Sequence, residues 1–143
     1  MKKYKLTNED KELIEKAKEI IIKSAPVGLV NVGDVGSALM TSRGNIFQGV
    51  CMDFFSGIGS CGEYQAIGSM VSNGESKIKK IAAVWYDEKT KKYQVIPPCG
   101  KCREMIKQLD KKNWNAEVII SSNEKVKLKD LLPYSWGGTI EKK

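Results

Sequence analysis

Two short cysteine-containing stretches constrain the fold of this 143-residue chain more than any other feature. The first is Cys61–Glu63, with the sequence CGE, and the second is Pro97–Arg103, with the sequence PPCGKCR. Each falls where the hydrophobic pattern predicts the start of a helix. Cys99 and Cys102 are three positions apart and therefore share one helix face. If their thiols act together, the fold must bring the first turns of two helices into contact.

The three thiols match the ligand set of a zinc ion. A catalytic zinc site has three protein ligands and leaves the fourth tetrahedral position to water, whereas a structural site fills all four positions. Cys61, Cys99 and Cys102 would supply the three ligands. Glu63 is close enough in sequence to reach that water without binding the metal, so it is placed to carry protons. Free N–H groups at the helix starts are expected to lower the thiol pKa values and so favour thiolates.

A hydrogen-bond donor is expected beside these sulfurs. Three thiolates and Zn²⁺ sum to a net negative charge, which weakens the ability of the metal to acidify water, so a group around the ligands must offset that charge. Arg103 and Lys101 are the candidates, and Arg103 is preferred because its guanidinium presents a rigid fork of donors.

Other interpretations of the same residues remain open. The Cys99-x-x-Cys102 pair alone is also typical of a redox pair or of half a structural zinc site. Cys51 could complete a four-thiolate structural site, or it could be a small buried thiol or a pocket residue. Phe54 and Phe55 could belong to the core, to a subunit contact or to a platform on which a base stacks.

Charge and composition exclude several classes of function. The net charge of +7 invites a nucleic-acid interpretation, but Arg43 and Arg103 are the only arginines and the lysines are scattered among acidic residues. Bidentate phosphate and base contacts favour arginine, so the sequence argues against a nucleic-acid partner. The chain contains no histidine, which excludes Ser-His-Asp and Cys-His catalysis and any zinc site that needs imidazole.

We expect residues 1–143 to form a single domain, because this length is large enough to bury a core. Apolar residues make up 41% and charged residues 29% of the chain, and no apolar run is long enough to cross a bilayer. A cytoplasmic location is the default expectation. In that reducing compartment the four cysteines are expected to be ligands or free thiols rather than disulfides.

Hydrophobic periodicity predicts alternating helices and strands. Thr7 is the expected N-cap of a first helix, whose apolar stripe runs from Leu13 to Ile21. Further helices are expected at about 61–73 and 99–110, and strands at 35–41, 46–50, 80–86, 93–96 and 117–121. A short helical turn is expected at 127–132. This alternation predicts an α/β domain with one five-stranded sheet and helices on both faces.

The order Cys-x-Glu followed at a distance by Pro-Cys-x-x-Cys resembles the zinc signature of the cytidine deaminase family. Within this family the chain resembles the blasticidin S deaminase-like members more specifically, and the resemblance covers about residues 35–136. Beyond the zinc signature, the stretches similar to the family are 35–39 at its first strand, 49–57 at its second strand and following loop, and 131–136 near its C-terminus. The resemblance implies a three-layer α/β/α fold with a five-stranded mixed sheet.

The same resemblance implies zinc-dependent hydrolytic deamination of cytidine or deoxycytidine, a small-molecule reaction that yields the uracil nucleoside and ammonia. Glu63 would carry protons between water, the ring and the departing amine. Many tetrameric members have an arginine directly after this glutamate, where the present chain has Tyr64, and this departure moves the expected supporting role to Arg103. The family is usually a homotetramer whose active sites are completed by neighbouring subunits.

The departures from the family concern the sugar rather than the base. Family members usually bind ribose hydroxyls with an Asn-x-Glu pair, at positions that hold Cys51 and Asp53 here, and their base-stacking aromatic residue aligns with Gly33. Asp53 can accept hydroxyl hydrogen bonds, but a thiol is a weak substitute for an amide. The resemblance also implies that Tyr134 and Trp136 lie near the substrate.

Three hypotheses about function follow. The first is deamination of a free cytosine nucleoside, and the second is deamination of a cytosine-containing antibiotic such as blasticidin S, a modified and cationic nucleoside to which Asp53, Tyr134 and Trp136 would be suited. The third is a non-catalytic zinc-binding protein, which predicts four thiolate ligands and no release of ammonia.

Overall fold

The computed structural model describes residues 1–23 and 27–137. Its elements follow one another along the chain as β1 (Tyr4–Lys5), α1 (Asn8–Glu19), β2 (Asn31–Thr41), β3 (Ile46–Asp53), the 3₁₀ turn η1 (Phe55–Gly57), α2 (Gly62–Ser72), β4 (Ile78–Asp87), β5 (Lys92–Ile96), α3 (Gly100–Leu109), η2 (Lys111–Asn115), β6 (Glu117–Ile119), β7 (Glu124–Lys127) and η3 (Leu128–Leu131). The predicted α/β class is confirmed, and each predicted helix and strand is present with shifted ends.

All described strands belong to one mixed sheet with the order β1-β7-β6-β4-β2-β3. Strand β4 pairs with β2 along one edge, and on the other edge it pairs with β6 in parallel and with β5 in antiparallel orientation. Within the described residues the sheet has seven strands, so the expected count of five is wrong. The sequence does not predict β1 and β7. They have two and four residues, too few for an apolar pattern, and they form by pairing, β7 with β6 and β1 with β7.

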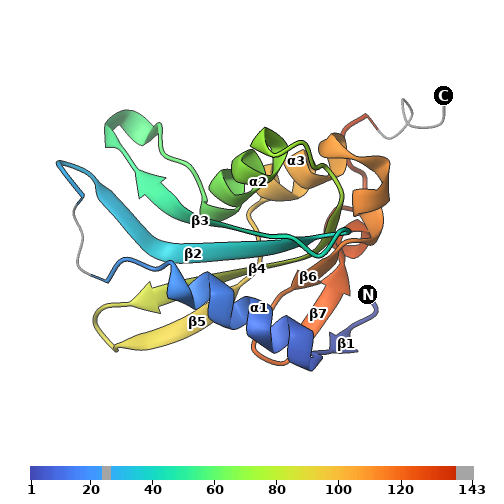
Figure 1. The fold of residues 1–143 in the computed structure, drawn as a ribbon, viewed down its shortest axis with the longest axis horizontal. Coiled ribbons are helices and arrows are strands. Elements are labelled where there is room, and N and C mark those ends of the chain that lie inside the picture. The colour runs from blue at the N-terminus through green and yellow to red at the C-terminus, as the bar shows by residue number, and fades with distance from the viewer. Residues whose placement is uncertain (24–26, 138–143) are drawn as a thin grey trace.

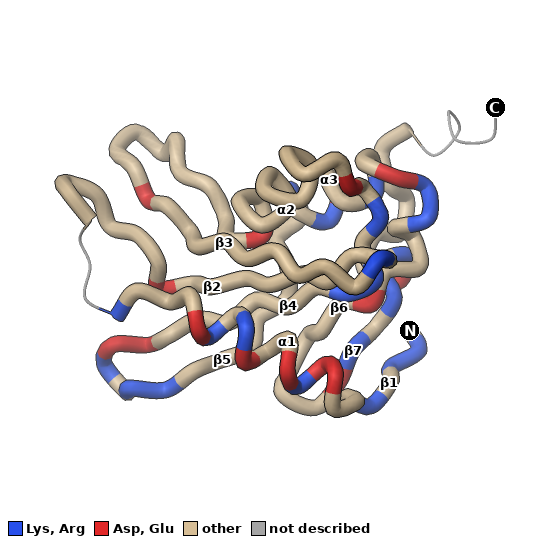
Figure 2. Tube along the Cα trace, viewed as in Figure 1, with Lys and Arg blue, Asp and Glu red and all other residues tan. Residues whose placement is uncertain are grey.

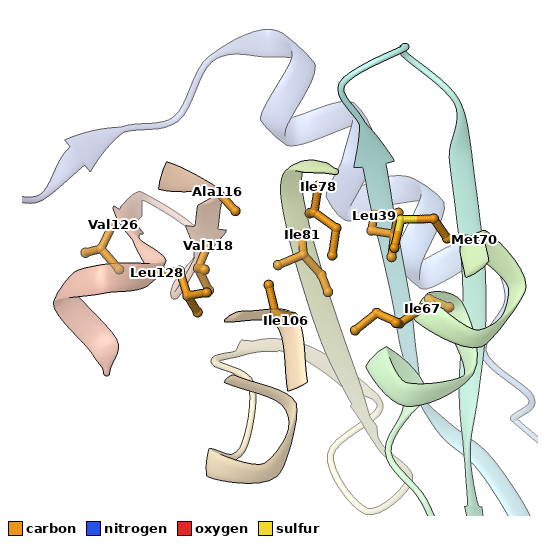
Figure 3. Close-up of a cluster of buried hydrophobic side chains, with 11 residues drawn as sticks. Leu39, Ile67, Met70, Ile78, Ile81, Ile106, Ala116, Val118, Val126 and Leu128 are labelled. Carbon is orange, nitrogen blue, oxygen red and sulfur yellow. The ribbon is translucent and has the colours of Figure 1, made fainter. Parts of the chain in front are cut away.

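Helices cover both faces of the sheet, as the three-layer prediction requires (Figure 1). Helix α1 packs on one face through an apolar cluster that joins Leu13, Ile14 and Ala17 to the central strands. Helices α2 and α3 pack on the opposite face, where the larger cluster shown in Figure 3 gathers side chains from both helices and from β2, β4, β6 and β7. Each fully buried Leu or Ile of this kind contributes about 1.5–3 kcal/mol to folding.

Helix α2 approaches β3 closely because Gly49 has no side chain. A Cβ atom at Gly49 would lie 2.4 Å from the backbone nitrogen of Ala66 and 2.5 Å from the carbonyl oxygen of Gly62. Helix and strand backbones are therefore in direct contact at the first turn of α2. This contact fixes the position of the helix start that carries Cys61 and Glu63.

The start of α1 is held by a capping box and a buried ion cluster. Thr7 accepts from the backbone of Asp10, and the Asp10 carboxylate accepts from the backbone N–H of Thr7. The same carboxylate is fully buried and binds the ammonium groups of Lys80 and Lys125 at 2.6 Å and 2.7 Å. The predicted cap at Thr7 is confirmed, and its partner also ties α1 to β4 and β7.

The α-helices of the described residues are short. They have 12, 11 and 10 residues, whereas a helix needs about 20 mostly apolar residues to span a bilayer. Within the described ranges, none combines the length and the apolar character that a membrane span requires.

Candidate metal centre and substrate pocket

The three predicted metal ligands lie at the N-terminal ends of α2 and α3. Cys61 is the N-cap of α2, Cys99 is the N-cap of α3, and Cys102 lies in the first turn of α3. The loop after β3 delivers Cys61, and the segment that follows β5 delivers Cys99. Because both helices cover the same face of the sheet, their starts converge (Figure 1).

The sulfur atoms of these residues form a tight cluster. The Sγ atoms of Cys61 and Cys99 lie 3.4 Å apart, and the three Sγ atoms all lie within 4.8 Å of one another. Tetrahedral zinc with Zn–S distances of about 2.3 Å places neighbouring sulfurs about 3.8 Å apart. The donor set and its spacing therefore fit a zinc ion. Cys102 is fully buried and Cys99 is exposed, so the cluster opens to solvent on one side.

The three thiols differ in their pKa values. Burial raises the pKa of both Cys61 and Cys102, and neighbouring acidic groups add to this effect. Burial opposes ionisation of Cys99 too, but hydrogen bonds from the backbone and thiol of Cys102 and from Cys61 outweigh it and lower its pKa. The expectation that a helix start lowers every thiol pKa is therefore right for Cys99 and wrong for the other two. Zinc deprotonates coordinating thiols outright. Cys99 loses its proton most easily of the three thiols, because its pKa is the one that is lowered.

Glu63 is a buried carboxyl group beside the sulfur cluster. Its side chain is 4% exposed, and it lines the same pocket as Cys61 and Cys99. Burial raises the pKa of Glu63 above its ordinary value. A carboxyl group with a raised pKa gains and loses a proton more readily near neutral pH, which suits a group that transfers protons.

A pocket of about 450 Å³ adjoins the cluster, a size common for small-molecule sites. Its lining combines the two cysteine-containing helix starts with the loop after β3 and the end of β5. The lining residues are Val35, Cys51, Asp53, Phe54, Gly57, Gly59, Ser60, Cys61, Gly62, Glu63, Ile96, Pro97, Cys99 and Lys101. Phe54 thus lies at the pocket, whereas Phe55 is 79% exposed and is not among the lining residues.

Cys51 lies outside the sulfur cluster. Among the described residues it groups with Asp34 and Asp53, whose ligand atoms and Sγ lie within 4.8 Å of one another. Its thiol donates to Asp34 Oδ1 at 2.9 Å. Burial and this bond to Asp34 raise the pKa of Cys51 to about 11. The Cys51 sulfur is bonded to Asp34 and does not belong to the group formed by the other three sulfurs, so this geometry favours three sulfur ligands over four.

The two cations near the cluster have partners other than the sulfurs. Arg103 donates to the carbonyl oxygens of Pro98 at 2.8 Å and Leu131 at 3.3 Å, so it braces the segment before α3 against the C-terminal region. The Lys101 ammonium lies 4.6 Å from the ring centroid of Tyr64. Donation from Arg103 or Lys101 to a ligand sulfur stays a prediction.

Tyr134 and Trp136 do not line the pocket of this chain. Their side chains are exposed, Trp136 at 71% and Tyr134 fully. The carbonyl oxygen of Trp136 accepts a hydrogen bond from Lys107, which holds this part of the chain against α3. A role at the substrate would therefore have to be played elsewhere in an assembly.

The sequence missed Asp34 and Trp85. Asp34 lies one residue before the strand predicted at 35–41. Its contact with Cys51 depends on an irregularity in the pairing of β2 with β3, which the residue pattern does not predict. The Trp85 indole donates to Asp34 Oδ2 at 3.2 Å. Gly33 has a positive φ of 84°, and a Cβ there would lie 2.7 Å from Ile22, so the aromatic residue expected from the family has no room at this position.

Comparisons with known proteins bear on this site. No protein-family model matches the chain. Blasticidin-S deaminase of Bacillus cereus is 37% identical over 110 residues, which covers 74% of this chain and 76% of that protein. The structure of cytidine deaminase from Burkholderia pseudomallei matches with a TM-score of 0.68 and 28% identity, over 92% of this chain and 100% of that one. Cytidine deaminase from Bacillus anthracis shares the fold, with a TM-score of 0.75 at 21% identity and 94% coverage of each chain.

Proposed function

The chain belongs to the cytidine deaminase family, in its blasticidin S deaminase-like branch, and from this membership we propose that it is a zinc-dependent aminohydrolase. The proposed reaction converts a cytosine nucleoside into the uracil nucleoside and releases ammonia. The observation that carries the proposal is the convergence of three cysteine sulfurs within 4.8 Å beside the buried carboxyl group of Glu63.

Cys61, Cys99 and Cys102 are the proposed zinc ligands. When bound there, zinc would supply a Lewis acid that makes water a nucleophile near neutral pH. The starts of α2 and α3 hold the sulfur atoms. The close contact of α2 with β3 at Gly49 fixes the position of Cys61 relative to Cys99 and Cys102. The exposed side of the cluster leaves the approach to a fourth position open to the pocket.

Glu63 is the proposed proton carrier. It takes a proton from the attacking water and delivers it to N3 of the ring as the oxygen adds to C4. Glu63 then takes the remaining proton from the new hydroxyl group at C4 and delivers it to the amino group, so that the C4–N bond breaks, ammonia leaves and the C4 carbonyl forms. The low exposure of Glu63 limits proton exchange with bulk water, and the raised pKa makes both transfers easier at neutral pH.

The rest of the pocket is proposed to hold the nucleoside. Phe54 lines the pocket and is proposed to contact the base, and backbone groups near Cys61 and Pro98 are proposed to bind the edge of the ring. Asp53 lines the pocket and can accept hydrogen bonds from sugar hydroxyls. Cys51 occupies the position where an amide would contact the sugar in the family, so selectivity for ribose is expected to be low.

A second candidate substrate is a cytosine-containing antibiotic such as blasticidin S. It is favoured by the 37% identity to the Bacillus cereus blasticidin-S deaminase and by the missing sugar partner at Cys51. Both candidates share one chemistry and differ in what is attached to N1 of the cytosine ring. The choice between them is therefore a question of relative kcat/KM.

We further propose a homotetramer in the cytoplasm. The loop after β3 exposes Phe55 at 79% and Ile58 at 74%, apolar surface that a neighbouring subunit would cover. In such an assembly Tyr134 and Trp136 are available to the pocket of another subunit. The free cysteines favour a reducing compartment. Sedimentation of the zinc-loaded protein tests the assembly, since a stable monomer would contradict it.

The experiment that tests the proposed function is an assay for uracil products across cytidine, deoxycytidine and blasticidin S, with the zinc content of the same sample measured. We expect turnover of at least one substrate with about one zinc per chain. Full zinc loading without ammonia release from any of them would contradict the proposal and favour a non-catalytic zinc protein. Its matched control is Glu88→Gln, an exposed site in the β4–β5 turn that should leave turnover unchanged.

A further inference from the structure

A β-bulge in β2 lies directly opposite Cys51. Val32 pairs with Met52 and Gly36 pairs with Val50, so the residues at 33–35 all face the single partner Cys51. The extra residues bend β2 around this thiol and turn Asp34 toward it. The backbone N–H of Val35 donates to the Cys51 sulfur at 3.4 Å.

The Cys51 thiol belongs to a hydrogen-bonded chain in which Asp34 links it to Trp85. It donates its proton to Asp34 Oδ1 at 2.9 Å, and Asp34 Oδ2 accepts from the Trp85 indole N–H at 3.2 Å. Asp34 lies on β2, Cys51 on β3 and Trp85 on β4, so the carboxylate is held from the strands on either side of its own. The elevated pKa of Cys51, about 11, keeps its proton in place near neutral pH. The thiol proton is therefore held in the hydrogen bond to Asp34.

The side of the pocket formed by β2 and β3 carries acidic groups and no basic ones. Asp34 and Asp53 are the charged residues of these two strands, and the loop residues 54–60 add no charge. Figure 2 shows basic segments on α1, α3, the turns and the C-terminal part of the chain, and Lys101 at the start of α3 is the basic residue among those that line the pocket. Cys51 and Asp53 both line the pocket. Carboxylate oxygens accept hydrogen bonds and donate none.

We propose that Asp34 is a specificity-determining positioning residue, which acts by holding the Cys51 proton away from the pocket. The wall formed by Cys51 and Asp53 then accepts hydrogen bonds from the substrate and donates none. This inference rests on the proposed function, because it concerns the substrate of that reaction. The inference adds the substrate class to the proposed function. The preferred substrates are cytosine nucleosides whose N1 substituent presents hydrogen-bond donors. A cationic donor is preferred over a hydroxyl group, and a substituent that can only accept hydrogen bonds is rejected.

The geometry of the cytosine ring directs the N1 substituent toward the wall formed by Cys51 and Asp53. C4 of cytosine must face Glu63, and N1 lies across the ring from C4, so the N1 substituent extends away from the metal centre. Asp53, which is exposed at the pocket edge, is placed to meet that substituent. A donor gains a charge-assisted hydrogen bond there, whereas an acceptor meets a carboxylate and a sulfur lone pair.

The test compares two sugar-modified probes, 3′-amino-3′-deoxycytidine and 3′-fluoro-3′-deoxycytidine, by the ratio of their kcat/KM values. Asp34→Asn is expected to lower the ratio of amino to fluoro probe about tenfold, because the freed thiol can then donate to the substrate. In a Cys51→Ala background the same change should alter the ratio less than about twofold, since the group through which Asp34 acts is gone. An equal effect of Asp34→Asn in both backgrounds would show that Asp34 acts by charge alone and would overturn the proposal.

A second readout does not depend on turnover. In the zinc-loaded protein Cys51 is the thiol that retains a proton, so its S–H stretching band can be assigned by its loss in Cys51→Ala. We expect this band to shift to higher frequency in Asp34→Asn, because the carboxylate acceptor is replaced by a weaker one. An unchanged band would overturn the positioning role of Asp34. If the wild type deaminates no cytosine nucleoside while the band shifts as expected, the proposed function fails and the specificity claim fails with it, but the hydrogen-bonded chain stands.

Discussion

The sulfur atoms of Cys61 and Cys99 lie 3.4 Å apart, although 38 positions separate the two residues in the chain. Each is the N-cap of a different helix, and the two helices share one face of the sheet. The packing of the core beneath α2 and α3 thus sets the distance between the sulfurs. A metal centre at this point is supported by rigid elements rather than by mobile loops.

Replacement of Glu63 by Gln should abolish deamination and leave zinc binding intact. The amide preserves the shape of the side chain but cannot carry a proton, and loss of a general acid–base group costs about 10²–10⁴ in rate. The measurement is kcat for the best nucleoside substrate together with the zinc content of each preparation. A Gln variant with a near-normal rate would remove Glu63 from the mechanism.

The cysteines should divide into two groups when each is replaced by Ser. Cys61→Ser, Cys99→Ser and Cys102→Ser should each lose most of the bound zinc, because each removes one of three soft ligands. Cys51→Ser should keep a full complement of zinc, since its sulfur bonds with Asp34 instead. The measurement is the zinc content of each variant after dialysis. Zinc loss in Cys51→Ser equal to that in the other three variants would favour a four-thiolate site.

Two glycines of the same region should respond in opposite directions to a methyl group. Gly49→Ala should destabilise the protein by about 1–3 kcal/mol, because its Cβ would collide with the backbone of α2. Gly68→Ala, in the interior of α2 with no atom within 4 Å of the added Cβ, should stabilise it by about 0.5–1 kcal/mol. Urea unfolding of both zinc-loaded variants measures the difference. Equal effects would mean that the approach of α2 to β3 is not tight.

Asp10→Asn should lower the free energy of unfolding by about 1–3 kcal/mol at neutral pH, because it removes the buried carboxylate that Lys80 and Lys125 share and leaves them only the less buried carboxylates of Glu9 and Glu117. Lys129→Gln serves as a control, since this residue lies in η3 on the periphery of the fold. Urea unfolding reports both values. A loss no larger than that of the control would mean that the ion cluster contributes little.

The effect of Asp10 should depend on pH. Burial alone would raise the pKa of Asp10, but hydrogen bonds from Lys125 and Lys80 outweigh it and lower the pKa from 3.8 to about 2. A carboxyl group with a depressed folded-state pKa stabilises the fold above its unfolded pKa and loses that contribution as the pH falls through the folded value. The stability gap between wild type and Asp10→Asn should therefore narrow between about pH 4 and pH 2. A gap that stays constant over this range would contradict the assigned shift.

Much of the site could be predicted because its signals are local. The Cys-x-Glu and Pro-Cys-x-x-Cys patterns stand at helix starts, and N-cap positions depend on only a few neighbouring residues. Thr7 was identifiable as a cap for the same reason, and its capping box is present. The alternation of apolar segments likewise predicts the layers of an α/β fold.

The features that escaped prediction depend on pairing across the sheet. Strands β1 and β7 are too short to show an apolar pattern, and they form because the fold pairs β7 with β6 and then β1 with β7. The contact between Asp34 and Cys51 depends on a bulge, which is a matter of register rather than of composition. The place of Trp136 beside α3 likewise involves a long-range bond, in which its backbone carbonyl oxygen accepts from Lys107, 29 positions earlier in the chain.

X-ray absorption at the zinc edge of the loaded protein tests the central claim most directly, because it counts the atoms bound to the metal. We predict three sulfur atoms at about 2.3 Å and one oxygen at about 2.0 Å, which is the coordination of an open catalytic centre. A shell of four sulfurs would contradict the account, since it would leave no position for the water that Glu63 is proposed to deprotonate.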